Sequence, residues 1–228
     1  FTMTTIEELG LLKMDFLGLR TLTVIHDTEL AVRRKDPDFR IANLDYDDPD
    51  TYAMLAKGET EGIFQLESTG MTQVLVSMRP KNLEDIIALI SLYRPGPMDS
   101  IPTYLRNRKD PSHVTYKTPQ MAHIVDVTNG VVIYQEQVMQ ICRELAGFSF
   151  GQADNVRRAM SKKKLKVMEA EREHFVHGCK EPGKECAGCV ANGVPENIAN
   201  EIYDDMISFA SYAFNKSHAA CYAYVAFQ

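Results

Sequence analysis

Apolar and polar positions alternate near the start of the chain. Leu12, Met14 and Phe16 fall on one side of the pattern, while Lys13 and Asp15 fall on the other. This period of two residues is typical of a half-buried strand, in which successive side chains point to opposite faces. We therefore predict a short strand at the N-terminus, with Lys13 and Asp15 on the same face.

Most of the remaining chain shows the spacing of helices. The stretch 35–50 is a polar connection with two prolines and many aspartates, and it is the first plausible boundary. A short β-branched run at 131–134 predicts a strand or turn that leads into a helix. The predicted fold class is mainly α, with a few short strands. Helices are expected at 19–34, 51–57, 68–78, 83–93, 135–146, 154–160, 165–176, 196–212 and in a last segment that Ser217 can cap.

Composition places the chain among globular proteins. It has 228 residues, of which 45% are apolar and 25% are charged. Its longest apolar run is far shorter than the ~20 residues that cross a bilayer, so we expect no membrane segment. The odd count of five cysteines argues against a secreted disulfide framework and favours reduced thiols in the cytoplasm. The chain starts at Phe1 and stops within an apolar stretch, which we interpret as a piece of a longer protein.

A net charge of −6 argues against coating nucleic acid by bulk charge, so any anion site must be local. One local cluster is basic throughout: Arg157, Arg158, Lys162, Lys163, Lys164 and Lys166. Like charges four residues apart on a helix cost about 0.2–0.5 kcal/mol, and a bound phosphate would relieve that cost. A solvated face, balanced by the glutamates that follow, explains the charge run equally well.

A second candidate anion site lies at 214–218. Asn215 and Lys216 come just before a predicted helix, whose free N–H groups favour negative charge. His218 and Tyr222 are four residues apart and would share a helix face, where a ring can stack beside a donor. From spacing alone, a capped core helix is the more favoured interpretation.

Lys13 and Asp15 could together bind a metal–phosphate complex, since a carboxylate binds a hard cation and an ammonium binds a phosphate oxygen. A surface ion pair would have the same pattern. One carboxylate cannot hold two Mg²⁺ ions, so a full two-metal site needs ligands from elsewhere. Asp36 and Asp38 are interpreted as solvated turn residues.

The late cysteines Cys179, Cys186 and Cys189, with His174 and His177 just upstream, are compatible with zinc. A lone CxxC with Cys179 and a helix-borne histidine lacks the second regular pair of ligands, so zinc is the less favoured interpretation. Cys221 lies near His218 and could suggest a nucleophile. A small residue on an alanine-rich helix is more often part of a core.

Six blocks occur in one order along the chain and carry a resemblance to a known family. They are 10–22 (GLLKMDFLGLRTL), 64–68 (FQLES), 93–98 (YRPGPM), 134–139 (YQEQVM), 153–163 (ADNVRRAMSKK) and 214–220 (FNKSHAA). Together they closely resemble the alpha subunits of bacterial DNA polymerase III, the C-family replicative polymerases. Ser161 stands where that family often has glycine.

This resemblance implies a division into the last edge of a palm domain at 1–25 and a multi-helical fingers domain at 26–228, truncated within its last helix. It implies a DNA-directed DNA polymerase, a nucleotidyltransferase of chromosomal replication, of which the isolated fragment would be inactive. The implied partners are template–primer DNA, a deoxynucleoside triphosphate (dNTP) and, in the full subunit, the sliding clamp and other replisome subunits. Two alternatives remain: a non-catalytic phosphate- or nucleic-acid-binding module, and a zinc-stabilised interaction domain.

The resemblance also implies roles for single residues. Asp15 matches the third catalytic aspartate, which binds one of two Mg²⁺ ions, and the other two aspartates lie outside this chain. The residues implied to bind the nucleotide are Lys13, Arg94, Arg157, Arg158, Lys162, Lys163, Asn215, Lys216, His218 and Tyr222.

Overall fold

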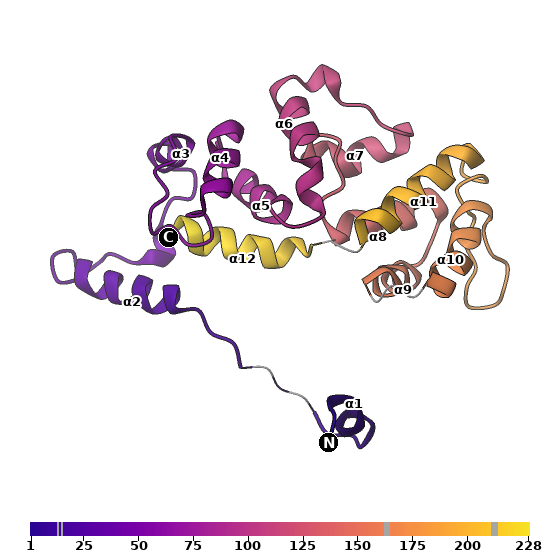
Figure 1. Ribbon diagram of the computed structural model, residues 1–228, viewed down its shortest axis with the longest axis horizontal. Helices are drawn as coiled ribbons and strands as arrows, with labels where there is room; N and C mark the ends of the chain where they lie inside the picture. Colours follow the sequence, from indigo (N-terminus) through magenta and orange to yellow (C-terminus); the bar gives the residue numbers. More distant parts are fainter. Residues whose placement is uncertain (13, 15, 162–164, 211–213) are drawn as a thin grey trace. The chain divides into compact units, whose positions relative to one another are not determined.

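The computed structural model describes residues 1–12, 14, 16–161, 165–210 and 214–228. The chain divides into two compact units (Figure 1): residues 1–44 with Gln228 form the first, and residues 45–227 form the second. The change from one unit to the other falls within the polar connection 35–50, where the sequence predicts the first boundary. The division at residue 25 between palm and fingers stays a prediction.

The first unit contains α1 (Met3–Glu8), α2 (Arg20–Val32) and the short 3-10 helix η1 (Ile41–Asn43). The N-terminal strand is not confirmed, because the described residues between α1 and α2 form no regular element. A strand is stabilised by backbone hydrogen bonds to a neighbouring strand. Alternation of apolar and polar residues does not by itself provide such a neighbour. Lys13 and Asp15 lie outside the described residues. Asp36 accepts the backbone N–H of Asp38 at 3.2 Å, as expected of exposed turn residues.

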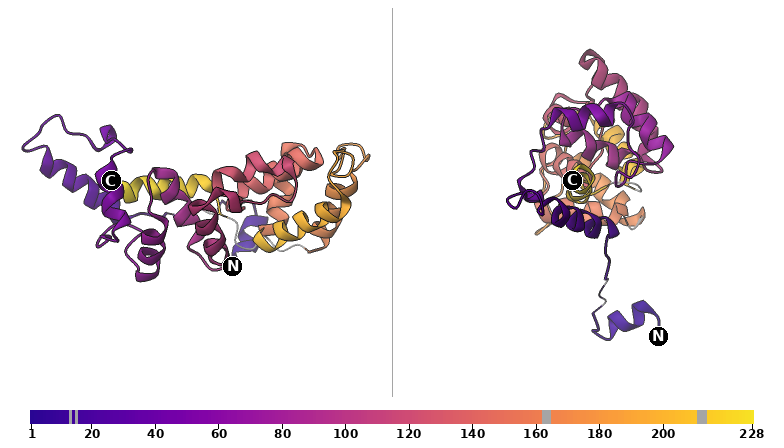
Figure 2. Two further views of the ribbon diagram at one scale, coloured as in Figure 1. Left: turned by 90° about the horizontal axis from the view of Figure 1, so that it is seen from above. Right: turned by 90° about the vertical axis from the view of Figure 1, so that its left-hand side faces the viewer.

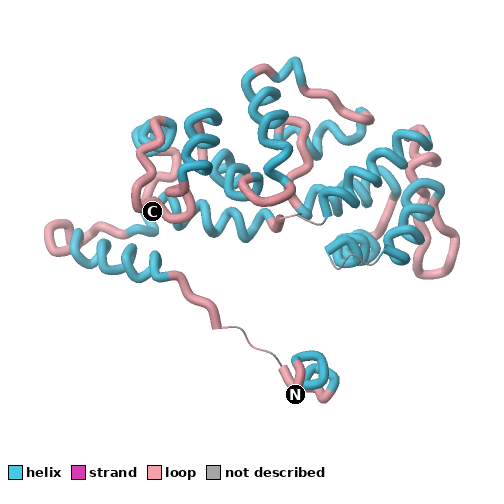
Figure 3. Tube along the Cα trace, viewed as in Figure 1, coloured by secondary structure: helices cyan, strands magenta, loops and turns pink. Residues whose placement is uncertain are grey.

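Helices dominate the second unit, and Figure 3 shows helices and loops in the part of the chain that it colours. The short 3-10 helices η2 (Pro97–Ser100), η3 (Pro111–His113), η4 (Pro119–Met121) and η5 (Asp126–Thr128) lie in the connections. The α-helices are α3 (Pro49–Ala56), α4 (Thr69–Met78), α5 (Leu83–Leu92), α6 (Ile101–Lys109), α7 (Ala122–Val125), α8 (Gln135–Ala146), α9 (Phe150–Ser161), α10 (Leu165–His177), α11 (Glu196–Ala210) and α12 (Lys216–Phe227).

One hydrophobic core of this unit surrounds α5. Every residue from Asp85 to Leu92 is buried, because helices and loops cover α5 on all sides. Ala219, Ala223 and Ala226 of α12 belong to the same core, and their small side chains let α12 pack closely along α5. Figure 2 shows α12 in yellow from two further directions.

The other core lies among α7 to α11. In α8, for which the sequence predicts a helix at 135–146, Val138, Ile141 and Leu145 form a buried apolar stripe. Gly147 ends α8 in the left-handed region, at φ 73°, which glycine adopts without strain. The two cores carry α9 and α12, which hold five of the predicted site residues: Arg157, Arg158, Lys216, His218 and Tyr222.

Two sequence predictions need correction in this unit. The run 131–134 forms no strand, and its one ladder-like contact is an isolated parallel bridge between Tyr134 and Phe214. A side chain takes the neighbouring N–H groups: Gln137 Oε1 accepts from Ile133 N and Tyr134 N. The cap of α12 is Asn215 rather than Ser217, since Asn215 Oδ1 accepts the N–H of His218 at 2.9 Å. In the described part of the chain, no helix has the length and apolar character needed to cross a membrane.

Candidate functional site

The start of α8 is fixed by one buried amide side chain. Gln137 is 3% exposed. Its Oε1 accepts the N–H groups of Ile133 and Tyr134 at 2.8 and 2.9 Å, and its Nε2 donates to Ile124 O and Thr128 Oγ1 at 3.0 and 2.8 Å. All four hydrogen-bonding positions of the amide are therefore used. This network sets where the first turn of α8 lies.

That first turn connects α9 with α12 (Figure 1) through two adjacent side chains. Gln135 Oε1 accepts from Arg157 Nη1 of α9 at 3.3 Å. Glu136 accepts the backbone N–H of Lys216 at 3.1 and 3.2 Å and the Nδ2 of Asn215 at 2.9 Å. The arginine pair of α9 and the start of α12 consequently belong to one arrangement.

The two adjacent arginines of α9 share one carboxylate. Asp154 Oδ1 accepts from Arg157 Nε and Nη2 at 2.9 and 2.7 Å, and its Oδ2 lies 2.7 Å from Arg158 Nε. Hydrogen bonds from Arg157 hold the pKa of Asp154 below its usual range. The positive charges of the basic cluster are thus partly balanced by Asp154. The basic cluster is counted from residue 157 onward, so that count does not include this acid.

Arg158 differs from Arg157 in exposure. The Arg158 side chain is 66% exposed, whereas the Arg157 side chain is 28% exposed. Asp154 engages the Nε of Arg158, and the high exposure of this side chain leaves its guanidinium accessible to a ligand. Asp154 therefore orients a guanidinium without covering it.

A carboxylate already lies at the predicted anion seat of α12. Glu136 accepts the first N–H of the helix, at Lys216, where the helix dipole favours negative charge. The Nζ of Lys216 pairs with Glu84 Oε2 at 2.9 Å and lies 5.4 Å from the centre of the Tyr134 ring. Lys216 is therefore held by acids from α5 and α8.

A row of rings extends from the same helix start. The Phe214 and His218 rings meet edge to face, with centroids 5.2 Å apart, and His218 lies 4.3 Å from Tyr222 at an interplanar angle of 32°. Tyr222 in turn lies 5.1 Å from Phe64. The predicted shared face of His218 and Tyr222 is thus confirmed.

Arg94 joins this row from the loop after α5. Its Cζ lies 3.4 Å from the centre of the Phe214 ring, which is a cation–π contact. Burial lowers the pKa of Arg94, and the nearby Tyr222 opposes that shift. An arginine remains charged under these conditions, so Arg94 adds a fixed positive charge beside the rings.

The structure thus brings seven of the predicted residues into two connected groups within the second unit. Arg157 and Arg158 form one group, and Arg94, Asn215, Lys216, His218 and Tyr222 form the other. Lys13, Asp15, Lys162 and Lys163 lie outside the described residues.

Sequence reasoning missed the acids and the amide that organise these groups. Asp154 could have been found, since it precedes the arginines by three and four residues on a helix. Glu84, Gln135 and Glu136 come from distant parts of the chain, and no local spacing relates them to Arg157 or Lys216.

Among the described residues, no group of three or more His, Cys, Asp or Glu side chains is arranged to hold a metal ion. Cys179, Cys186 and Cys189 are free thiols.

Comparison with known proteins shows the family to which this mainly helical chain belongs. A family model described as the bacterial DNA polymerase III alpha subunit finger domain matches residues 21–183, and the chain belongs to that family. Over its whole length, the chain is 46% identical to the DNA polymerase III subunit alpha of Staphylococcus aureus strain N315, covering 20% of that protein. It is 47% identical to the subunit of the same name from Thermus aquaticus, covering 18% of that protein. The chain thus spans about a fifth of the length of these curated relatives.

Proposed function

We propose that this chain is part of a DNA-directed DNA polymerase and that its second unit binds the triphosphate of an incoming dNTP. The family match and the names of the relatives support a polymerase. In this proposal residues 26–228 are fingers and residues up to 25 are the last edge of the palm. The reaction is attack of a primer 3′-hydroxyl on the α-phosphate, with release of pyrophosphate.

One observation carries the proposal most strongly. The first turn of α8 joins the arginine pair of α9, through Gln135, to the cationic start of α12, through Glu136. A triphosphate carries up to four negative charges, so it needs several cations held at defined positions. The α8 turn supplies a rigid base for such cations, because Gln137 fixes its position.

The arginines suit a phosphate ligand better than lysines in their place would. Arg158 presents a planar fork of donors to solvent, and such forks bind two phosphate oxygens at once. In the proposal Arg158 and Arg157 bind the phosphates, with Lys162 and Lys163 as neighbours. The resulting charge-assisted hydrogen bonds hold the triphosphate in line for attack.

The start of α12 would bind the same ligand from another side. Lys216 exchanges its carboxylate partner Glu84 for a phosphate oxygen, and Asn215 Nδ2 likewise exchanges its partner Glu136. His218 donates from the first turn. Tyr222, which lies between His218 and Phe64 in the ring row, stacks on the sugar or base. Arg94 contacts a phosphate or the template from its place on Phe214.

Asp15 is proposed as the catalytic aspartate, with Lys13 beside it as a phosphate ligand. Magnesium ions bound by Asp15 and by aspartates elsewhere in the polymerase would supply charge neutralisation. The described residues contain no group of three or more His, Cys, Asp or Glu side chains placed to hold a metal ion, and no step is assigned to a metal ion within them. Template–primer DNA, the sliding clamp and other replisome subunits are the proposed partners of the whole protein, in the cytoplasm.

The test is steady-state primer extension by the full-length protein with Arg158→Ala. Loss of a charged hydrogen bond costs about 1.5–3 kcal/mol, so kcat/KM for dNTP should fall about 10- to 150-fold. Arg143→Ala is the matched control. Arg143 is an exposed arginine in the last turn of α8, at the other end of that helix from the first turn that holds Gln135 and Glu136. Its kinetics should stay unchanged.

Equal kinetics for Arg158→Ala and the unmodified protein would remove Arg158 from the site. Equal losses in both variants would indicate a general charge effect. If the protein binds phosphate without metal or primer and shows no primer extension, the non-catalytic binding module would be favoured.

A further inference from the structure

A short loop between α10 and α11, residues 178–189, places two cysteines directly opposite each other. We call it the cysteine loop. The N–H of Cys179 donates to Cys186 O at 3.0 Å, and the N–H of Cys186 donates to Cys179 O at 2.9 Å. These reciprocal bonds make an isolated antiparallel bridge. Paired residues of an antiparallel bridge project their side chains to the same side.

This pairing suits a disulfide. The Cα atoms of residues that exchange both hydrogen bonds lie about 5.5 Å apart, and disulfides span Cα separations of about 4.4–6.8 Å. The Cβ atoms of a hydrogen-bonded pair lie near the wide end of the range of about 4.5–5.5 Å, so they must approach by roughly 1–1.7 Å to bond. The bridge is isolated, hence no adjoining ladder resists that movement.

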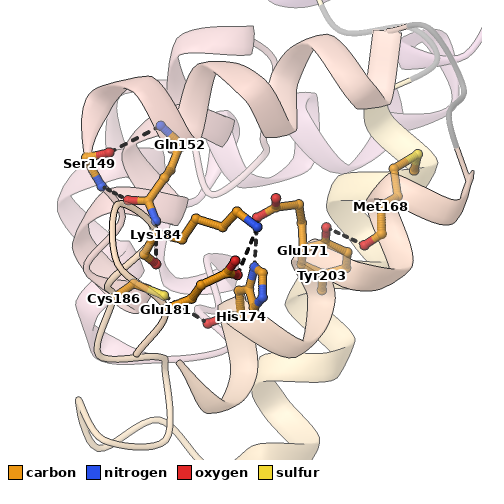
Figure 4. Close-up of polar contacts among 9 residues, drawn as sticks. All are labelled: Ser149, Gln152, Met168, Glu171, His174, Glu181, Lys184, Cys186 and Tyr203. Carbon is orange, nitrogen blue, oxygen red and sulfur yellow. Dashed lines mark hydrogen bonds and ion pairs between the residues drawn. The ribbon is translucent and has the colours of Figure 1, made fainter. Parts of the chain in front are cut away.

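Glycines fix the path of the cysteine loop. Gly178 and Gly188 have φ values of 84° and 81°, and a Cβ on Gly178 would lie 2.4 Å from Ala187 O. The backbone segments therefore approach more closely than any other residue allows. Lys184 Nζ donates to Glu181 at 2.9 Å, and Lys184 O accepts from Gln152 Nε2 at 2.8 Å. Figure 4 shows these residues and their contacts. The loop is held in the shape that keeps Cys179 opposite Cys186.

The other described cysteines are less suited to form a disulfide. Cys142 and Cys189 are fully buried, which keeps them from a dissolved oxidant. Burial raises the pKa of both the Cys189 thiol and the Cys186 thiol, so exposure and not pKa distinguishes them. Cys221 is exposed on α12, far along the chain from the loop. Cys179 and Cys186 are both partly exposed, and Cys186 Sγ donates to His174 O at 3.5 Å.

We propose that Cys179 and Cys186 form a reversible dithiol–disulfide pair, oxidised by low-molecular-weight disulfides such as glutathione disulfide. One cysteine thiolate attacks the disulfide, forms a mixed disulfide and releases one reduced thiol. The second cysteine, as thiolate, then attacks the bound cysteine sulfur and releases the second reduced thiol. Two protein thiols are oxidised and one small disulfide is reduced, so electrons and atoms balance.

The test uses the full-length protein incubated with mixtures of oxidised and reduced glutathione, then alkylated and digested with trypsin without reduction. Lys180 and Lys184 separate Cys179 from Cys186, so a bond between them links two tryptic peptides. We expect mass spectrometry to find this linked pair lacking two hydrogens, and dithiothreitol to reverse it. Cys221 should carry a glutathione in the same sample and shows that the oxidant was active.

Two serine variants make the result specific. Cys189→Ser should keep the linked pair, whereas Cys186→Ser should lose it and leave a glutathione on Cys179. The proposal is overturned if Cys221 is modified while Cys179 and Cys186 stay reduced or carry separate glutathiones. A bond that requires Cys189 overturns it as well.

Discussion

Replacing Gln137 with leucine should loosen the start of α8 selectively. The substitution keeps a similar volume but removes an acceptor from the N–H groups of Ile133 and Tyr134. It also removes a donor from Ile124 O and Thr128 Oγ1. These groups are buried with the side chain, so water does not readily replace the lost partners.

The expected cost in free energy follows from the number of buried groups that lose a hydrogen-bond partner. Each buried group left without a partner costs about 1–3 kcal/mol, and burial of the leucine recovers part of the sum. We expect a net loss of about 3–5 kcal/mol in the local free energy of opening. Since about 1.4 kcal/mol corresponds to a tenfold change, amide exchange at Ile133 and Tyr134 should accelerate by more than about 100-fold.

Hydrogen exchange of the full-length protein, followed by mass spectrometry, measures this effect. Gln140→Leu is the matched control, because Gln140 is exposed on the same helix and should leave exchange unchanged. Acceleration of less than about fivefold in Gln137→Leu, a difference near 1 kcal/mol, would refute the reasoning. So would equal acceleration in both variants.

Three further predictions concern ion pairs and caps. Asp85 accepts two 2.6 Å hydrogen bonds from Arg108, so Asp85→Ala should cost about 3–5 kcal/mol in denaturant unfolding, and Asp85→Leu combined with Arg108→Met should cost less. Asn215→Ala should cost about 1 kcal/mol at the first turn of α12, measured by hydrogen exchange, whereas Asn215→Ser should restore the cap. The pKa of Asp154 is lowered by Arg157, so its stabilising contribution is present above the unfolded pKa of about 3.9 and is lost as pH falls through the lower folded value. The difference in unfolding midpoint between Asp154→Asn and the unmodified protein should accordingly stay constant from about pH 5 to 8 and shrink below about pH 4; a constant difference at low pH would contradict this.

Local patterns predicted the helices well where start and stop signals agreed. For α8, the apolar stripe and Gly147 define both ends, and the predicted range 135–146 matches the structure. For α12, Asn215 and Ser217 are both acceptable caps by type. Asn215 also donates to Glu136 from α8, a tertiary contact that favours it and that local sequence does not contain.

For the site residues, too, local sequence could predict only those contacts that lie within one element. Spacing alone related His218 to Tyr222, and their rings are in contact. The stacking of Arg94 on Phe214 joins residues 120 positions apart, so only the folded chain reveals it. The alternation at 12–16 predicted a strand, but alternation does not specify a partner strand, and the described residues there are irregular.

The structure of the full-length protein with primer–template DNA and a non-hydrolysable dNTP analogue tests the central claim most directly. The account predicts triphosphate oxygens within hydrogen-bond distance, about 2.7–3.2 Å, of the Arg157 and Arg158 guanidinium groups and of Lys216 or His218. A triphosphate bound elsewhere, with both arginines still paired to Asp154 and neither in contact with a phosphate oxygen, would contradict it.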